Sequence, residues 1–245
     1  MTKNKTPAAA TGNEQDNLPD AGSSEVEVDA FLNKVKSLAV TQKAGARGRL
    51  IFAMDATMSR QPTWDMALGL QAGMFSSVKS VGGLDVQLVY FRGFGECQSS
   101  KWVKNPESLA SLMTQVSCRG GHTQIGRVLS HALNETNDTR VNALVYVGDC
   151  MEENIDDLSA VAGELGLLGM PVFLFQEGND TKAETAFREI ARLTGGAYCR
   201  FDAGSAAQLR ELLSAVAVYA AGGRKALEDY SGGKGGARGL LEQLN

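Results

Sequence analysis

Residues 49–59 read RLIFAMDATMS, and this stretch decides the fold. The apolar run that ends at Met54 is typical of a strand buried on both faces of a sheet. Directly after it, side chains that carry oxygen occupy alternate positions, at Asp55, Thr57 and Ser59. Because side chains alternate in direction along an extended chain, these three can converge on one side. The stretch therefore predicts a buried strand that opens into a cluster of oxygen ligands.

Strands and helices alternate along the rest of the chain. Apolar runs bounded by turn residues predict further strands at 84–91, 96–103, 143–148, 170–175 and 197–201. Apolar positions at helical spacing predict helices at 26–40, 62–80, 106–116, 124–134, 155–166, 182–194 and 205–219. Gly93 and Gly95 connect the strand at 84–91 to the one at 96–103, which predicts an antiparallel pair. The predicted fold class is α/β: a doubly wound, Rossmann-like, mostly parallel central sheet with one antiparallel edge strand and helices on both faces.

Length and composition predict one domain with two tails. A chain of 245 residues can bury one substantial core and leaves little material for a second. Residues 1–24 are polar and contain few large apolar side chains, so we expect a disordered tail. Residues 25–48 are interpreted as a leading helix and its connection, and residues 49–219 as the domain. Glycines interrupt the charged segment 220–245, which predicts a flexible tail.

A second carboxylate follows a second buried strand. Asp149 comes directly after the run 143–148, and it neighbours Asp55 if the two strands are adjacent. Two close carboxylates repel each other, whereas a divalent cation between them lets both stay charged. The loop Gly120-Gly121-His122-Thr123 opens a helix and can bring the hydroxyl of Thr123 to the same edge. Such an all-oxygen set suits magnesium or manganese better than zinc.

Charge, hydropathy and cysteine usage narrow the class of protein. The net charge is −4 and the basic residues are scattered, so the sequence shows no electrostatic footprint for nucleic acid. The amino terminus lacks the apolar core of a secretory signal, and no later stretch is apolar enough to cross a bilayer. A cytoplasmic protein without membrane contact is expected. There the four cysteines stay reduced, and we interpret them as small buried residues: Cys97, Cys118, Cys150 and Cys199.

The pattern Asp55-x-Thr57-x-Ser59, with Thr123 after paired glycines and Asp149 after a buried strand, resembles the metal-ion-dependent adhesion site of von Willebrand factor A (VWA) domains. The resemblance runs from about residue 49 to 219, and it is to the intracellular bacterial type. It implies that Thr57, Ser59 and Thr123 ligate a cation directly, with Asp55 and Asp149 acting directly or through water. Threonine replaces the commoner serine at position 57, and Cys150 stands where glycine is frequent.

The resemblance implies a protein-binding function. In the family, an open coordination position of a magnesium or manganese ion accepts an Asp or Glu side chain from a partner protein. Intracellular bacterial members often serve ATPase, chaperone or stress-response assemblies, so a partner of that kind is expected. A metal-free scaffold with a degenerate site is the first alternative. A metal-dependent hydrolase is the second, although the sequence lacks a phosphate-binding Gly-x-x-x-x-Gly-Lys-Ser/Thr loop and a Gly-x-Ser-x-Gly elbow.

Structural explanations compete with the metal role at each position. Thr57 and Ser59 could cap the helix that follows them, and Asp149 could cap the helix after its strand. Glu152 or Glu153 could favour the positive end of that same helix. His122 in a glycine loop is more typical of a loop-bracing residue than of a catalytic one. No enzymatic activity is predicted.

Overall fold

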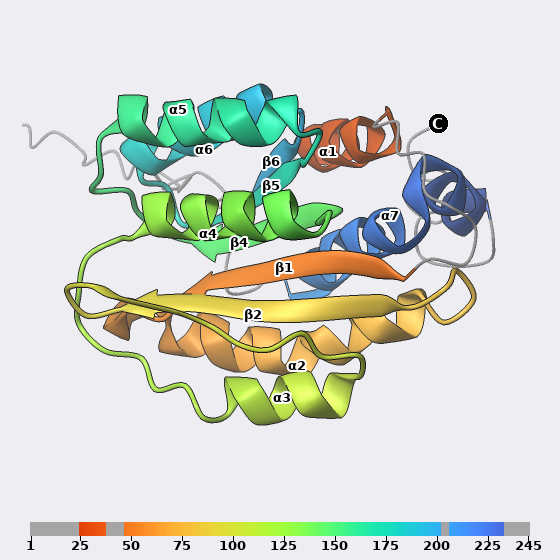
Figure 1. Ribbon diagram of the computed structural model, residues 1–245, viewed down its shortest axis with the longest axis horizontal. Helices are drawn as coiled ribbons and strands as arrows, with labels where there is room; N and C mark the ends of the chain where they lie inside the picture. Colours follow the sequence, from red (N-terminus) through yellow and green to blue (C-terminus); the bar gives the residue numbers. More distant parts are fainter. Residues whose placement is uncertain (1–24, 38–46, 202–205, 233–245) are drawn as a thin grey trace, which may run out of the picture.

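The computed structural model describes residues 25–37, 47–201 and 206–232, and its core is a six-stranded sheet in the order β3-β2-β1-β4-β5-β6. Figure 1 shows its strands running between two layers of helices. All neighbouring strands are parallel except β2 and β3, which are antiparallel. The strands are β1 (Gly48–Asp55), β2 (Leu84–Arg92), β3 (Glu96–Ser99), β4 (Ala143–Gly148), β5 (Val172–Glu177) and β6 (Ala197–Phe201).

Alternate side chains of the strands separate two hydrophobic cores, one on each face of the sheet. In β1, one core contains Leu50, Phe52 and Met54, and the core on the opposite face of the sheet contains Ile51 and Ala53. The first layer contains α1 (Glu25–Ser37), α2 (Gln61–Ser77), α3 (Pro106–Met113) and α7 (Ala206–Gly232). The second contains α4 (Ile125–Asp138), α5 (Ile155–Leu167) and α6 (Thr181–Thr194), seen above the sheet in Figure 1.

The sheet has a topological switch point between β1 and β4. From β1 the chain leads to β2 on one side, and it later returns to place β4 on the other side. In open α/β sheets, loops diverge at such a point and leave a crevice beyond the carboxyl ends of the strands. The predicted doubly wound, mostly parallel fold with one antiparallel edge strand is confirmed. The carboxyl end of β1 is consequently the place to look for a site.

The third strand is shorter than the sequence predicted. Pairing with β2 ends at Ser99, and a separate bridge joins Val103 to Val86. Between them, the hydroxyl of Ser100 accepts a hydrogen bond from the backbone N–H of Leu88 at 3.0 Å. Because a side chain takes the place of a backbone carbonyl there, the ladder is interrupted.

The last helix is longer than the sequence predicted. It continues from Ala206 to Gly232, where a flexible tail was expected from residue 220, and it bends at Gly223, whose φ is 69° and ψ −163°. The glycine absorbs a conformation that other residues avoid, so the helical segments can join across it. Ala220, Ala221 and Leu227 are buried, and this packing supplies the reason for the extension.

Other expectations about the termini lie outside the described residues. The predicted disordered segment 1–24, the end of the leading helix after Ser37, and residues 233–245 belong to this group. In the described part of the chain, none of the helices has the length and apolar character that a membrane span requires.

Candidate metal centre

Asp55 and Asp149 meet at the switch point. Asp55 is the last residue of β1, Asp149 directly follows β4, and the two strands are paired up to Met54 and Val147. One carboxylate oxygen from each and the sulfur of Cys150 all lie within 4.8 Å of one another. The sequence therefore placed the two carboxylates correctly as neighbours. That they bind a metal stays a prediction.

The loop after β1 directs its hydroxyls to the same point. The backbone N–H of Thr57 donates to Asp55 Oδ1 at 2.7 Å, which folds the loop back on the strand end. The hydroxyls of Thr57 and Ser59 lie 3.4 Å apart, and Ser59 Oγ donates to Asp149 Oδ2 at 3.3 Å. Met58, between them, is 64 % exposed. The alternation predicted from the sequence thus gathers one carboxylate and two hydroxyls around the second carboxylate.

Helix capping does not account for Thr57. It precedes a short 3-10 helix, Met58–Arg60, that leads into α2, but its side chain makes no capping hydrogen bond within the described chain. Nor does Asp149 cap α5, because the side chain of Asn154 accepts from the backbone N–H of Asp156 at that helix start. The structural alternatives for these two positions therefore lose their main support.

Two carboxylate oxygens at this point are buried and unpartnered. Asp55 is 1 % exposed, and its Oδ2, like Oδ1 of Asp149, has no hydrogen-bond partner among the residues that the structure describes. Burial raises the pKa of Asp55 to about 6, and the charge of Asp149 adds to the effect, while hydrogen bonds from Thr57 and the charge of Arg60 oppose it. A buried carboxylate oxygen without a donor is costly. The donor set fits a bound cation, which would relieve that cost.

Arg60 is a buried charge that the sequence analysis missed. Its Nη1 donates to Glu177 Oε2 at 2.6 Å, whereas its Nε lies 3.3 Å from Asp149 Oδ2 without hydrogen-bond geometry. Thr63 also donates to Glu177. Glu177 therefore carries most of the compensation for Arg60.

The group formed by Asp55, Asp149, Glu177 and Arg60 carries a net negative charge. Three carboxylates, from Asp55, Asp149 and Glu177, face the single guanidinium of Arg60, which leaves a formal charge of −2 when all are ionised. Glu177 ends β5, the strand beside β4, so the rule that identified Asp55 and Asp149 could also have identified Glu177. A charge of −2 matches a divalent cation.

Thr123 lies at the same edge but is engaged elsewhere. Its backbone N–H donates to Glu152 Oε2 at 3.0 Å, and its hydroxyl accepts from the backbone N–H of Glu152 at 3.0 Å. The loop before it is tied to the cluster, because Arg119 N–H donates to the carbonyl of Ala56 at 3.0 Å. A hydroxyl has two lone pairs, so one acceptor position of Thr123 is left after this contact. The structure brings four predicted ligands together, whereas the side chain and backbone N–H of the fifth, Thr123, contact Glu152.

A close approach between two loops requires glycine at position 121. A Cβ added there would lie 2.1 Å from the carbonyl oxygen of Gly93, and the N–H of His122 donates to that oxygen at 3.2 Å. His122 is exposed, its Nδ1 lies 3.1 Å from Glu152 Oε1, and its ring meets the edge of Phe94. These contacts agree with a loop-bracing role.

The two acidic residues after Asp149 act on a different helix from the expected one. Glu153 accepts hydrogen bonds from the backbone N–H groups of Ile125 at 2.6 Å and Gly126 at 2.9 Å, at the start of α4. The expectation that it favours the start of α5 was therefore wrong. The reason is tertiary: the segment after β4 crosses the amino terminus of α4, whose free N–H groups attract a carboxylate.

Cys118 and Cys199 are buried as predicted, but Cys97 is partly exposed, and Cys150 is not the small buried residue that the sequence suggested either. It is partly exposed and its sulfur belongs to the cluster with Asp55 and Asp149. Burial raises the pKa of its thiol to about 12, and the charge of the neighbouring Asp149 adds to the effect.

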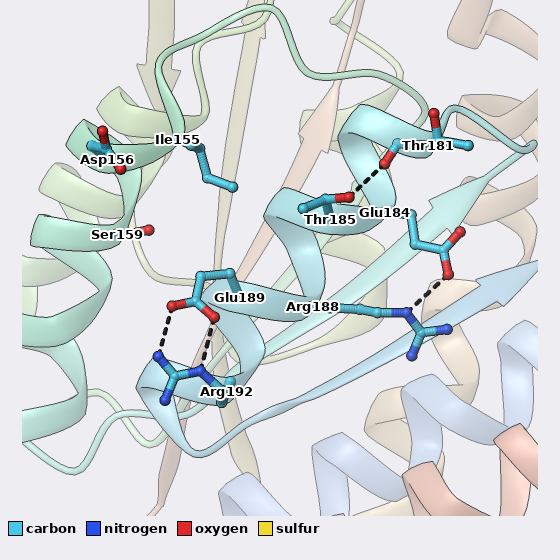
Figure 2. A pocket seen from close by; sticks show the side chains of 9 residues that line it. All are labelled: Ile155, Asp156, Ser159, Thr181, Glu184, Thr185, Arg188, Glu189 and Arg192. Carbon is cyan, nitrogen blue, oxygen red and sulfur yellow. Dashed lines mark hydrogen bonds and ion pairs between the residues drawn. The ribbon is translucent and has the colours of Figure 1, made fainter.

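A separate hollow of about 660 Å³ lies between α5 and α6. Figure 2 shows two ion pairs among the side chains that line it: Glu184 with Arg188 at 2.9 Å, and Glu189 with Arg192 at 2.7 Å. The hydroxyl of Thr185 donates to the carbonyl of Thr181. Four of the charged groups that line this hollow are engaged in such pairs, in contrast to the unpartnered oxygens at the switch point.

Comparison with known proteins shows the fold. No family model matches the sequence, and no curated protein matches it. The solved structure of a von Willebrand factor type A protein from Catenulispora acidiphila matches 71 % of this chain and 43 % of its own, with 14 % identity and a TM-score of 0.59. The chain thus spans less than half of that protein.

Two further structures are similar. The SpRpn10 VWA domain matches 69 % of this chain and 93 % of its own, with 11 % identity and a TM-score of 0.52. Proximal thread matrix protein 1 from the mussel byssus, solved with a zinc-occupied MIDAS motif, matches 72 % and 49 %, with 17 % identity and a TM-score of 0.57. The chain has the fold of a VWA domain.

Proposed function

We propose that this chain is a metal-dependent protein-binding module. A divalent cation at the switch point is held by Asp55, Thr57, Ser59 and Asp149, with Thr123 completing the set. The cation then accepts an Asp or Glu side chain from a partner protein. The observation that carries the proposal is the pair of buried oxygens, Asp55 Oδ2 and Asp149 Oδ1, that lack a hydrogen-bond partner in the described chain.

Electrostatics favours a divalent cation bound between the carboxylates of Asp55 and Asp149 over the two carboxylates alone. Two carboxylates this close disfavour each other's ionisation, and burial adds to the penalty at Asp55, whose pKa is about 6. Arg60 does not remove the conflict, because its shorter contact is with Glu177. A cation of charge +2 offsets the remaining formal charge of −2. The oxygen ligands taken alone suit magnesium or manganese.

The surroundings of the pair support a protein partner. Met58 is 64 % exposed and Phe94 is 84 % exposed, and both lie at the carboxyl edge of the sheet. Exposed large apolar side chains beside a charged anchor point are typical of binding faces. The similar fold of the mussel protein with a zinc-occupied MIDAS motif supports a metal at this edge. The resemblance further suggests a cytoplasmic partner in an ATPase or chaperone assembly.

Calorimetric titration with magnesium and manganese tests the metal site. We expect saturable binding by the wild-type chain and at least a ~100-fold loss of affinity in Asp55→Asn and Asp149→Asn, because each variant replaces a charged ligand by a neutral one. Asp157→Asn is the matched control, since Asp157 is an exposed carboxylate on α5. Its affinity should equal that of the wild type. Equal affinity in all four proteins would contradict the proposed ligands.

The open coordination position has its own test. Bound manganese that keeps an exchangeable water enhances the relaxation of bulk water protons. Acetate, a minimal analogue of an Asp or Glu side chain, should displace that water and lower the enhancement in the wild-type chain. A bound manganese ion without enhancement would mean that the site is closed to a partner's carboxylate.

Arg60 favours one competing function, a metal-free scaffold. Its guanidinium lies 3.3 Å from Asp149 and could serve as the cation of the site. In that case the wild-type chain gives no heat with either metal, and Arg60→Met destabilises the fold without creating a binding site. Under the metal proposal, Arg60→Met still binds the cation. A hydrolase finds less support, because His122 is exposed and contacts Glu152 rather than the carboxylate pair.

A further inference from the structure

We propose that Cys150 is a ligand of the same cation, and that the site therefore prefers a thiophilic divalent ion of the zinc and cobalt class over magnesium. The inference rests on the proposed function for the location of the site and goes beyond it in the identity of the ion. It replaces the all-oxygen set expected from the sequence by a mixed set of two carboxylates and one sulfur.

The geometry of the three ligand atoms fits a zinc-sized ion. Zinc binds sulfur at about 2.3 Å and carboxylate oxygen at about 2.1 Å, so ligand atoms around one tetrahedral ion are separated by roughly 3.4 to 3.6 Å. The ligand atoms of Asp55, Asp149 and Cys150 all lie within 4.8 Å of one another. A contraction of at most about 1.4 Å in any one of these separations brings all three into direct contact with one ion.

A second observation shows that this cluster is directed at a ligand. Asp55 is 1 % exposed, and its Oδ2 is unpartnered within the described chain. The unpartnered Oδ1 of Asp149 belongs to the other carboxylate of the same cluster. The sulfur of Cys150 therefore lies beside two unpartnered carboxylate oxygens that a cation would compensate.

Ligand chemistry then selects the ion. Magnesium takes oxygen ligands at near-octahedral geometry and keeps several waters, so it gains nothing from a sulfur. Zinc and cobalt bind thiolate strongly, and a thiolate with carboxylates makes a favourable mixed set for them. On binding, the S–H bond of Cys150 breaks, its proton goes to solvent, and a metal–sulfur bond forms. No electron is transferred.

The charge balance permits a thiolate at this position. The ion pair of Arg60 with Glu177 is neutral, and a divalent cation neutralises Asp55 and Asp149. Adding the thiolate leaves a formal charge of −1 on the group, since the charge of Arg60 is already balanced by Glu177. A bound divalent ion stabilises a coordinating thiolate.

Cobalt(II) absorption tests this inference directly. The full chain, with its thiols reduced, is titrated with cobalt while the near-ultraviolet sulfur-to-cobalt charge-transfer band is recorded. We expect a band that saturates at one equivalent in the wild type and disappears in Cys150→Ser. Cys97→Ser is the matched control, because Cys97 is a partly exposed thiol on β3 outside the cluster, and it should keep the band.

Competition calorimetry supplies the second readout. Cys150→Ser should weaken zinc binding by at least about tenfold and leave magnesium affinity unchanged within about twofold, because only zinc uses the sulfur. Saturable binding of magnesium and cobalt without the band, or a band that persists in Cys150→Ser, would overturn the role of Cys150 while the proposed metal site stands. No binding of any of these ions by the folded wild type would overturn both.

Discussion

Two clusters of charged residues in this chain differ in how many hydrogen-bond donors their carboxylates have. On α4, Glu135 Oε2 accepts from Arg49 Nη2 at 3.0 Å and from Trp102 Nε1 at 3.1 Å, and its Oε1 accepts from Gln87 at 3.3 Å. The guanidinium of Arg49 also stacks over Trp102. At the switch point, one oxygen of Asp55 is buried without a donor in the described residues.

The pKa values record this difference. Burial acts to raise the pKa of Glu135, but the hydrogen bonds from Trp102 and Gln87 and the charge of Arg49 lower it overall. Burial raises the pKa of Asp55 to about 6, because its donors are too few. A carboxylate with a full set of donors stabilises the fold. A buried carboxylate that lacks hydrogen-bond donors from the protein indicates a binding site for a cation or another ligand.

The largest expected effect is stabilisation by metal. Magnesium or manganese at 100 times its dissociation constant should raise the free energy of unfolding of the wild type by about 2.7 kcal/mol. Asp149→Asn should lose this gain, because its amide cannot compensate a cation. Urea unfolding with and without metal measures both. A gain in Asp149→Asn equal to that of the wild type would place the ion elsewhere.

The second effect is a pH dependence of folding stability, which has opposite signs for Asp55 and for Glu135. With a chelator present to remove metal, the pKa of Asp55 is about 6 in the folded chain and 3.8 in the unfolded chain. Between these pH values the folded chain keeps a proton on Asp55 that the unfolded chain has released. Stability therefore falls as pH rises through this window, by on the order of 2 kcal/mol. Asp55→Asn should abolish that fall, and the comparison of the two unfolding curves from pH 4 to 7 isolates it. An identical pH dependence in both proteins would contradict the raised pKa.

For Glu135 the sign is reversed. Its lowered pKa means that its contribution is present above the ordinary pKa and is lost as pH falls through the folded value. Glu135→Gln should reduce stability at pH 7 by about 1.5 kcal/mol, because the hydrogen bonds from Arg49 and Trp102 lose the negative charge of their acceptor. Thermal or urea unfolding measures the loss. Metal affinity should stay at the wild-type value, and a loss of metal binding here would mean that the two clusters are coupled.

The smallest effect is expected at Phe94. Its side chain is 84 % exposed, so Phe94→Ser should change stability by less than about 0.5 kcal/mol and leave metal affinity unchanged. If Phe94 belongs to the binding face, only partner binding weakens. A large loss of stability would show that its contact with His122 braces the loop before Thr123.

The sequence predicted the position of the carboxylate pair because both residues follow uninterrupted apolar runs. A run buried on both faces must be a central parallel strand, and its carboxyl end must lie at the ligand-binding edge. Asp55 and Asp149 met these conditions, and β1 and β4 are neighbours. The alternation of Thr57 and Ser59 then followed from strand geometry. The fold class was predictable for the same reason.

Other features depend on contacts between segments distant in sequence. Arg60 reads as an ordinary solvated arginine until β5 brings Glu177 beside it. Glu153 is close in sequence to α5, but the segment that carries it crosses the start of α4. The glycines after residue 220 predict a tail, yet burial of Leu227 holds the second half of α7. Cys150 has no local pattern that separates a ligand from a core residue.

The most direct test of the metal site is anomalous diffraction from crystals of the full chain grown with manganese. We predict one strong anomalous peak between the carboxylates of Asp55 and Asp149, within direct-ligand distance of both, with Ser59 and Thr57 beside it. The peak should be missing in crystals of Asp149→Asn prepared in the same way. A wild-type map without a peak at this position, from a folded chain at saturating manganese, would contradict the central claim.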